Sequence, residues 1–285
     1  MLRLIRVSCA CNRHMSVPNA ETCLPRALAQ GHHLRIQAVM NADPDIPDSL
    51  TMHLNGENEL VFSRQILHAG IIKELLEQHG SGEEARADFT AGGPASGKSG
   101  LIDFLRLAEN AVVIDVDLIR HRLPEYATWL QERPEQAAVL TQREASDIAQ
   151  RAFAAALQDG QIVVFDGVGG NDAGKFTERI GATLAQTHRV RVFYATVPTD
   201  VALQREEARY QETGRRVPRE YLINKHAEVS RGFPDVVALS VEHIAVYDMT
   251  GDQPQLLAHG PGGTPDALEV VDPAGYADFL RKGQA

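Results

Sequence analysis

Eight consecutive residues have the types and spacing that a bound phosphate chain requires. The stretch GGPASGKS at residues 92–99 matches the pattern G-x-x-x-x-G-K-S/T, after an apolar run and before an amphipathic one. Glycines let backbone N–H groups turn toward phosphate oxygens, and the following helix N-terminus adds partial positive charge. The Lys98 ammonium reaches the terminal phosphates and the Ser99 hydroxyl ligates Mg²⁺. The expected nucleotide-binding residues are therefore Gly92, Gly93, Pro94, Ala95, Ser96, Gly97, Lys98 and Ser99, with ATP and Mg²⁺ as ligands, and the alternative is a mere glycine turn.

Two acids follow a second apolar run. Asp115 and Asp117 stand at i and i+2, so they point to the same side of an extended chain. Ligands of parallel sheets lie beyond the carboxyl ends of the strands, where Asp117 can accept a proton from an attacking hydroxyl. The alternative is that Asp117 only caps a helix.

A third apolar run ends at Asp166, and the Gly-Val-Gly-Gly sequence of residues 167–170 gives the backbone room to approach a ligand. Asp166 can hold Mg²⁺ through water or bind substrate. A tight turn at the end of the strand is the alternative.

Arginines recur further along the chain, at Arg205, Arg209, Arg215 and Arg216. Phosphoryl transfer spreads negative charge over the γ-phosphate oxygens, and an arginine-bearing segment can close over that charge while excluding water. We prefer Arg209 and Arg215 as the catalytic pair of such a lid. The alternative is a solvated charged helix, because glutamates alternate with these arginines.

The elements that position these residues alternate between short apolar runs and helical patterns, which is typical of a parallel sheet with crossover helices. Expected strands cover residues 88–91, 112–115, 162–166, 190–196 and 244–247. Expected helices cover residues 62–78, 98–108, 135–158, 173–186, 200–211, 219–231 and 276–280, and residues 251–263 form a loop-rich tail. We predict an α/β fold of the P-loop NTPase type, an open, mostly parallel sheet with helices on both faces.

Composition limits the partners of the chain. Its 285 residues include 28 Lys and Arg against 38 Asp and Glu, and the formal net charge of -10 repels nucleic acid unless basic groups are concentrated locally. No apolar run reaches the length of about 18 residues that a membrane span requires. We expect a soluble, cytoplasmic protein that binds neither nucleic acid nor a membrane.

Residues 1–60 lack a periodic apolar pattern and contain many turn formers, so we expect a poorly ordered or accessory leader before a kinase domain at residues 61–285. Cys9, Cys11 and Cys23 lie in this leader and could chelate zinc together with His14. The C-x-C start differs from the usual C-x-x-C knuckle, which favours an unstructured leader without a metal.

The order of the motifs resembles the zeta toxin family of P-loop kinases over residues 89–248. The matching pieces are GGPASGKSG, VIDVDLIRHRLPEY, REASDIAQRA, VVFDGVGG, YATVP and TGRRVP. The resemblance implies a kinase that moves the γ-phosphate of ATP to a sugar hydroxyl of UDP-N-acetylglucosamine. It further implies that the protein acts as a toxin, with an antitoxin protein as a partner.

The resemblance also implies residue roles. Asp117 matches the general base, Lys98 and Ser99 match the phosphate and Mg²⁺ groups, and Arg209 and Arg215 match the ATP-clamping arginines, with Arg205 as an alternative to Arg209. The candidate substrate-binding residues are Asp117, Arg120, Glu144, Ser146 and Asp166, and the candidate metal ligands are Ser99 and Asp166.

Two departures from the family pattern concern the acceptor. Gln150 stands where the family has a substrate-contacting glutamate, which leaves Glu144 and Ser146 as substitutes. Gly170 stands where an arginine is expected, and Lys175 replaces that cation only if the loop folds back. The motifs thus support a small-molecule kinase more firmly than any named acceptor. An antibiotic or nucleoside phosphotransferase and a nucleotide-dependent ATPase switch remain alternatives.

Overall fold

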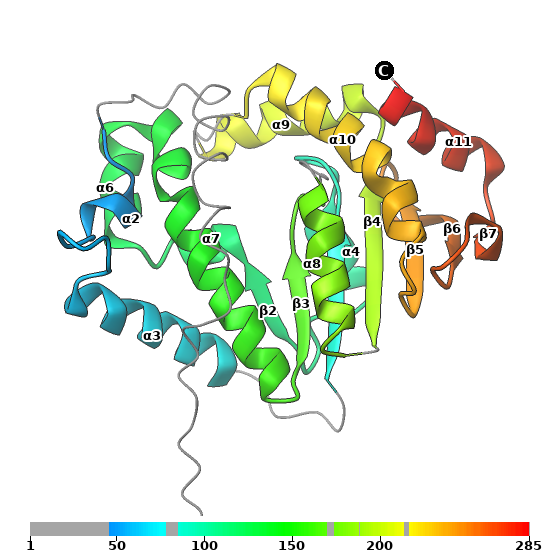
Figure 1. The fold of residues 1–285 in the computed structure, drawn as a ribbon. Coiled ribbons are helices and arrows are strands. Elements are labelled where there is room, and N and C mark those ends of the chain that lie inside the picture. The colour runs from blue at the N-terminus through cyan, green and yellow to red at the C-terminus, as the bar shows by residue number, and fades with distance from the viewer. Residues whose placement is uncertain (1–45, 78–84, 170–173, 188, 214–216, 285) are drawn as a thin grey trace, which may run out of the picture.

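A seven-stranded sheet forms the centre of the computed structural model, which describes residues 46–77, 85–169, 174–187, 189–213 and 217–284 (Figure 1). In spatial order the strands are β2 (Val112–Asp115), β3 (Ile162–Asp166), β1 (Arg86–Ala91), β4 (Val190–Thr196), β5 (His243–Asp248), β6 (Gln255–Gly260) and β7 (Glu269–Val270). The strands from β2 to β5 in this order pair in parallel, whereas β5, β6 and β7 pair antiparallel. The five predicted strands are present, and the predicted open, mostly parallel sheet is confirmed.

Strand β6 corrects the prediction of a loop-rich tail over residues 251–263. It pairs with β5 in an antiparallel hairpin, and Leu257 and Ala258 are each 1% exposed. The apolar run of β6 is short and lies among turn-forming residues, so its own pattern is weak. The pairing with β5 supplies the backbone hydrogen bonds that make it a strand.

Helices cover both faces of the sheet, as predicted. They are α2 (Ser49–Met52), α3 (Phe62–Glu77), α4 (Lys98–Phe104), α5 (Val116–Arg120), α6 (Pro124–Glu132), α7 (Pro134–Gln158), α8 (Lys175–Leu184), α9 (Thr199–Thr213), α10 (Arg219–Val237) and α11 (Pro273–Arg281), with short 3-10 turns η2 (Pro265–Ala267) and η3 (Lys282–Gln284). Figure 1 shows α7 and α8 in front of the sheet and α4 behind it. None of the helices in the described part of the chain is long and apolar enough to cross a membrane.

The core has one layer on each face of the sheet, because successive residues of a strand point to opposite faces. Val192 and Tyr194 of β4 belong to the layer that α7, α8 and α10 cover. Phe193 and Ala195 belong to the layer that α4 covers. This packing fixes the carboxyl ends of β1, β2, β3 and β4 at one edge of the sheet.

Part of the predicted leader lies within the described residues. Helix α2 begins at Ser49, and Asp48 caps it by accepting a hydrogen bond from the Thr51 backbone N–H at 2.7 Å. Asp48 also lies 3.6 Å from the guanidinium of Arg143 on α7. Residues 1–45, with all three cysteines, lie outside the described residues, and the division of the chain at residue 60 remains a prediction.

Candidate active site

The predicted phosphate-binding loop joins β1 to α4. β1 ends at Ala91 and α4 begins at Lys98, and Gly97 before the helix has a left-handed backbone with φ of 91°, which glycine adopts readily. The Lys98 ammonium donates to the Gly92 carbonyl oxygen at 3.2 Å, so it points back across the loop. Strand, loop and helix N-terminus thus have the arrangement that a phosphate cradle requires.

The first two glycines of the loop are closely packed. A Cβ on Gly93 would lie 2.3 Å from Cδ2 of His226, and a Cβ on Gly92 would lie 2.6 Å from the Ala195 carbonyl oxygen. His226 Nε2 lies 2.9 Å from the Pro94 carbonyl oxygen. Burial lowers the pKa of His226 to about 4, so the ring is neutral at physiological pH and its Nε2–H donates to that carbonyl. The loop is therefore held by close packing around Gly92 and Gly93 and by a hydrogen bond from the neutral His226 imidazole.

The predicted acids lie at the carboxyl ends of neighbouring strands. Asp115 of β2 and Asp166 of β3 occupy paired positions in the sheet. Asp166 accepts a hydrogen bond from the Thr90 hydroxyl of β1 at 2.6 Å, which joins it to the strand that leads into the loop. Burial raises the pKa of Asp115, and the nearby charges of Asp166 and Asp117 raise it further. These acids therefore form one group beside the phosphate-binding loop.

Asp115, and not Asp117, caps helix α5. The Asp115 carboxylate accepts a hydrogen bond from the Asp117 backbone N–H at 2.7 Å. Asp117 lies in the first turn of α5, and its side chain is 46% exposed. The alternative in which Asp117 serves only as the helix cap is therefore wrong, and its carboxylate is accessible to a ligand.

A row of hydrogen bonds joins three of the predicted substrate-binding residues. Arg120 is 2% exposed, and its guanidinium contacts the Asp117 carboxylate and the Gln142 side-chain oxygen. The Gln142 amide donates to the Ser146 hydroxyl at 2.8 Å, one turn further along α7. Asp117, Arg120 and Ser146 are thus brought together through Gln142. Gln142 is not among the residues predicted for the site, although its i, i+4 spacing from Ser146 places both on one helix face.

Glu144 has a different environment from the one predicted for a substrate ligand. It is 0% exposed, and its carboxylate accepts hydrogen bonds from Arg64 Nε at 2.5 Å and Nη2 at 2.8 Å and lies 2.6 Å from His68 Nε2. Burial acts to raise the pKa of Glu144, but the hydrogen bonds from Arg64, His68 and Ser49 outweigh it and lower the pKa to about 2. The ionised Glu144 joins α3 to α7, and we leave it out of the acceptor pocket.

The predicted Mg²⁺ ligands are a hydroxyl and a carboxylate. Ser99 lies in the first turn of α4 and is exposed, and Asp166 ends β3. Within the described ranges, no group of three or more His, Cys, Asp and Glu side chains is arranged to hold a metal ion. One hydroxyl and one carboxylate fit Mg²⁺ that is bound mainly by phosphate oxygens and water.

Arg205 lies beside the phosphate-binding loop. Its guanidinium donates to the Met249 carbonyl oxygen at 2.7 Å, immediately after β5. A Cβ on Gly97 would lie 3.5 Å from its Nη1. Arg205, the alternative to Arg209, is therefore the arginine of α9 that this structure places against the loop.

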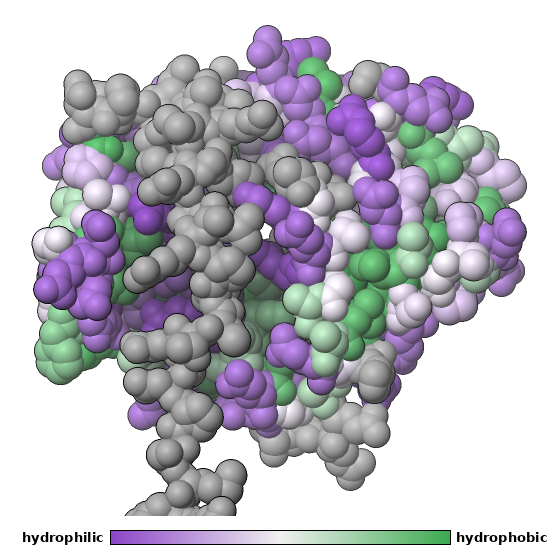
Figure 2. Space-filling view, viewed as in Figure 1, coloured by the Kyte–Doolittle hydropathy of each residue, from purple (hydrophilic) through white to green (hydrophobic). Residues whose placement is uncertain are grey.

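Arg209 pairs within its own helix, with the Glu206 carboxylate. Glu206 is 5% exposed and also accepts a hydrogen bond from the Val217 backbone N–H at 2.7 Å. Arg215 lies in the segment 214–216, outside the described residues. Hydrophilic residues gather at the top of Figure 2, where α9 lies, as the solvated-helix alternative requires of the outer surface of α9.

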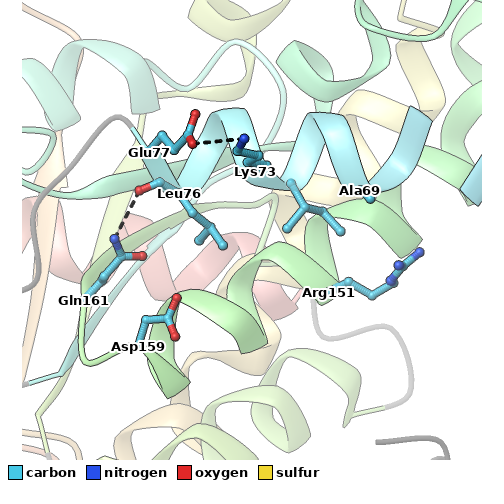
Figure 3. Close-up of a pocket in the computed structure, with 8 residues that line it drawn as sticks. Ala69, Lys73, Leu76, Glu77, Arg151, Asp159 and Gln161 are labelled. Carbon is cyan, nitrogen blue, oxygen red and sulfur yellow. Dashed lines mark hydrogen bonds and ion pairs between the residues drawn. The ribbon is translucent and has the colours of Figure 1, made fainter. Parts of the chain in front are cut away.

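A separate pocket lies at the opposite edge of the sheet. Figure 3 shows its lining residues on α3 and at the end of α7. The pocket has a volume of about 510 Å³. Gln161, which lines it, precedes the first residue of β3, and its amide donates to the Leu76 carbonyl oxygen at 3.2 Å. This pocket lies at the amino ends of the strands, whereas the phosphate-binding loop lies at their carboxyl ends.

The strand order, the loop between β1 and α4, and the acids that end β2 and β3 define a P-loop kinase-like α/β fold. The zeta toxin family model matches residues 72–255, more than half of the chain. The chain therefore belongs to the zeta toxin family of kinase-like phosphotransferases.

Solved structures share this fold at low sequence identity. The AvrRxo1-ORF1:-ORF2 complex matches with a TM-score of 0.61 and 15% identity over 79% of this chain and 75% of that one. The complex with ATP matches with a TM-score of 0.58 and 15% identity over 79% and 74%. The PezAT chromosomal toxin-antitoxin system of Streptococcus pneumoniae matches with a TM-score of 0.59 and 14% identity over 79% and 95%. No curated protein matches the chain.

Proposed function

We propose that this protein is a kinase that transfers the γ-phosphate of ATP to a hydroxyl of a nucleotide sugar, with UDP-N-acetylglucosamine as the first candidate acceptor. One observation carries the proposal: the phosphate-binding loop with Lys98 and the partly exposed Asp117 carboxylate lie at the same edge of the sheet. A phosphoryl donor and an alcohol acceptor can meet there. Membership of the zeta toxin family supports the same reaction class.

The Asp117 carboxylate takes the proton of the acceptor hydroxyl in this reaction. The acceptor oxygen forms a bond to the γ-phosphorus, the bond from that phosphorus to the β,γ-bridging oxygen breaks, and ADP leaves. Lys98 and backbone N–H groups at the N-terminus of α4 stabilise the phosphate charges, and Arg120 orients Asp117. Ser99 and Asp166 would hold Mg²⁺, which neutralises charge on the phosphates.

Arginines complete the charge neutralisation in this proposal. Arg205 already lies against the loop, and we assign Arg209 and Arg215 to the segment that closes over the γ-phosphate. Closure requires Arg209 to exchange the carboxylate of Glu206 for a phosphate oxygen. Since the phosphate carries more charge than one carboxylate, ATP favours this exchange.

We further infer that the protein acts as a toxin in the cytoplasm, where it depletes a nucleotide sugar, and that an antitoxin protein restrains it. The similar folds include a toxin-antitoxin system and an ORF1:-ORF2 complex. We assign the activity to residues 61–285, because every residue placed in the site belongs to that range. Cell growth on expression of the original chain, compared with growth on expression of Lys98→Ala, tests the toxin inference, and co-purification of a protein that restores growth tests the antitoxin inference.

The reaction is tested with purified protein, ATP, Mg²⁺ and a panel of nucleotide sugars, nucleosides and antibiotics. Mass spectrometry is expected to find one acceptor class heavier by one phosphoryl group. Asp117→Asn is expected to lose transfer by about a hundredfold to ten-thousandfold, the usual contribution of a general base. Asp117→Asn is expected to keep its affinity for ATP, whereas Lys98→Ala is expected to lose both ATP binding and phosphoryl transfer. Hydrolysis of ATP with no phosphorylated acceptor would instead support an ATPase switch.

A further inference from the structure

The last turn of the described chain reaches the sheet edge that carries the phosphate-binding loop. Figure 1 shows the C-terminal end beside α10, where η3 follows α11. The Lys282 ammonium donates two hydrogen bonds of 2.5 Å, to the Thr196 hydroxyl and to the Val197 carbonyl oxygen. Both acceptors lie at the carboxyl end of β4, which pairs directly with β1. Lys282 itself lies outside the residues that the family model matches.

Contacts with α10 fix this turn in place. The Ser230 hydroxyl donates to the Phe279 carbonyl oxygen at 2.5 Å and accepts a hydrogen bond from the Gly283 backbone N–H at 3.2 Å. Arg231 Nε donates to the Gly283 carbonyl oxygen at 3.1 Å. A Cβ on Gly283 would lie only 2.7 Å from the Arg231 backbone nitrogen, so the close approach requires glycine. Lys282 therefore extends from a turn that is packed against α10.

The end of β4 supports the loop through Met249. The Thr196 carbonyl oxygen accepts a hydrogen bond from the Met249 backbone N–H at 2.8 Å. Met249 Cβ lies 3.0 Å from the position that a Cβ on Gly97 would take, and the Met249 carbonyl oxygen binds Arg205. A shift of Thr196 would therefore move the residue that supports both Gly97 and Arg205.

Lys282 also adds charge near the loop. Burial lowers the pKa of His226, and the charges of Lys282 and Lys98 lower it further, which places both ammonium groups near one imidazole. Burial lowers the pKa of Lys282 to about 8, while Asp248 and Asp278 act to raise it. The ammonium form therefore prevails at neutral pH. A triphosphate held at Lys98 gains from this second positive charge.

We propose that Lys282 is a positioning residue of the nucleotide site, which holds the end of β4, and through Met249 the loop and Arg205, in the arrangement that binds ATP. This inference rests on the proposed function. It gives a residue beyond the matched family region an indirect part in nucleotide binding. Because Lys282 hydrogen-bonds protein groups at the end of β4, its loss is expected to weaken ATP binding more than it slows phosphoryl transfer.

The test measures the Kd of the full chain for ATP with Mg²⁺ by calorimetry. It then measures KM for ATP and kcat with the acceptor that the screen identifies as a substrate. Lys282→Met is expected to raise Kd and KM for ATP about tenfold, because it removes two charge-assisted hydrogen bonds, with kcat within about threefold of the original. Lys282→Arg keeps the charge and the donors and is expected to restore most of the affinity. Arg281→Met is the matched control, since Arg281 is 70% exposed and pairs with Asp278.

Thr196→Val provides a second variant, because it removes one acceptor and keeps the side-chain volume. It is expected to raise the Kd for ATP about fivefold, the usual effect of one hydrogen bond. Unchanged Kd in Lys282→Met, or in Thr196→Val where the former does not fold, would overturn the proposal. A fall in melting temperature with no rescue of Kd by Lys282→Arg would show a packing role and also overturn it. Absence of ATP binding in the unaltered chain would refute the proposed function as well, so the two failures are distinct.

Discussion

The proposed nucleotide side and the proposed acceptor side of the site are held by different kinds of contact. On the nucleotide side, the loop packs against the Ala195 carbonyl oxygen and a neutral His226 ring. On the acceptor side, buried charged groups determine the positions of the side chains, as with Arg120 and Glu144. Backbone groups in a cradle recognise phosphate whatever side chains surround them, whereas a row of charged and polar side chains can be changed one residue at a time. The nucleotide and acceptor specificities of this fold can therefore vary separately.

Each side is also braced by a segment outside the matched family region. Arg64 and His68 of α3 contact Glu144 and thereby join α3 to the helix that carries Gln142 and Ser146. The C-terminal turn supports the end of β4 on the other side. The family region alone therefore lacks contacts that hold both halves of the site.

The largest effect is expected from a change that breaks the buried contact between Arg64 and Glu144, which joins α3 to α7. Glu144→Gln leaves the Arg64 guanidinium buried with one charged partner fewer, so the free energy of unfolding is expected to fall by about 3–5 kcal/mol. Urea denaturation measures this loss. Asp147→Asn, on the same helix but 44% exposed, is the control and is expected to cost less than about 1 kcal/mol. Equal losses in the two variants would contradict a structural role for Glu144.

Acid titration is a second test of the contact between Arg64 and Glu144. The pKa of Glu144 in the folded protein is about 2, below its ordinary value of 4.5 in the unfolded chain. The unfolded state therefore binds the proton first, and the stabilisation is complete above pH 4.5 and is lost as the pH falls toward 2. The difference in stability between the original chain and Glu144→Gln is expected to shrink over this range. A difference that is constant with pH would show that the charge of Glu144 is not responsible.

A smaller effect is expected from a change in the shape of the nucleotide side. Gly93→Ala places a Cβ 2.3 Å from the His226 ring, and the resulting strain is expected to weaken ATP binding by about 1–3 kcal/mol. Calorimetry measures the change in Kd. Replacing His226 by Ala in the same chain removes the clash and is expected to recover part of the affinity. Gly181→Ala in α8, where a Cβ meets nothing within 4 Å, is the control. No recovery in the double variant would contradict the steric explanation.

Local sequence patterns predicted the strands and the helix around the phosphate-binding loop well, and the contacts of Arg64, Glu144 and Lys282 poorly. The bounds of β3 and β4, and the strand, loop and helix around Lys98, follow from apolar runs and glycines that are adjacent in the chain. Contacts between distant residues leave no such pattern: His226 lies 132 positions from Pro94, and Arg64 lies 80 from Glu144. Lys282 lies 86 positions from Thr196. The burial that gives Glu144 a structural role depends on α3, so its sequence position alone suggested a substrate contact.

The smallest effect sharpens the separation of the two sides. Gln142→Leu keeps the side-chain volume but removes the link between Arg120 and Ser146, so Asp117 is held by a less constrained guanidinium. KM for the acceptor is expected to rise about fivefold, as for one lost hydrogen bond, while the Kd for ATP stays unchanged. Gln158→Leu, at an exposed position in the last turn of the same helix, is the control. If ATP affinity falls together with acceptor affinity in Gln142→Leu, the two sides share one set of supports and specificity cannot vary on one side alone.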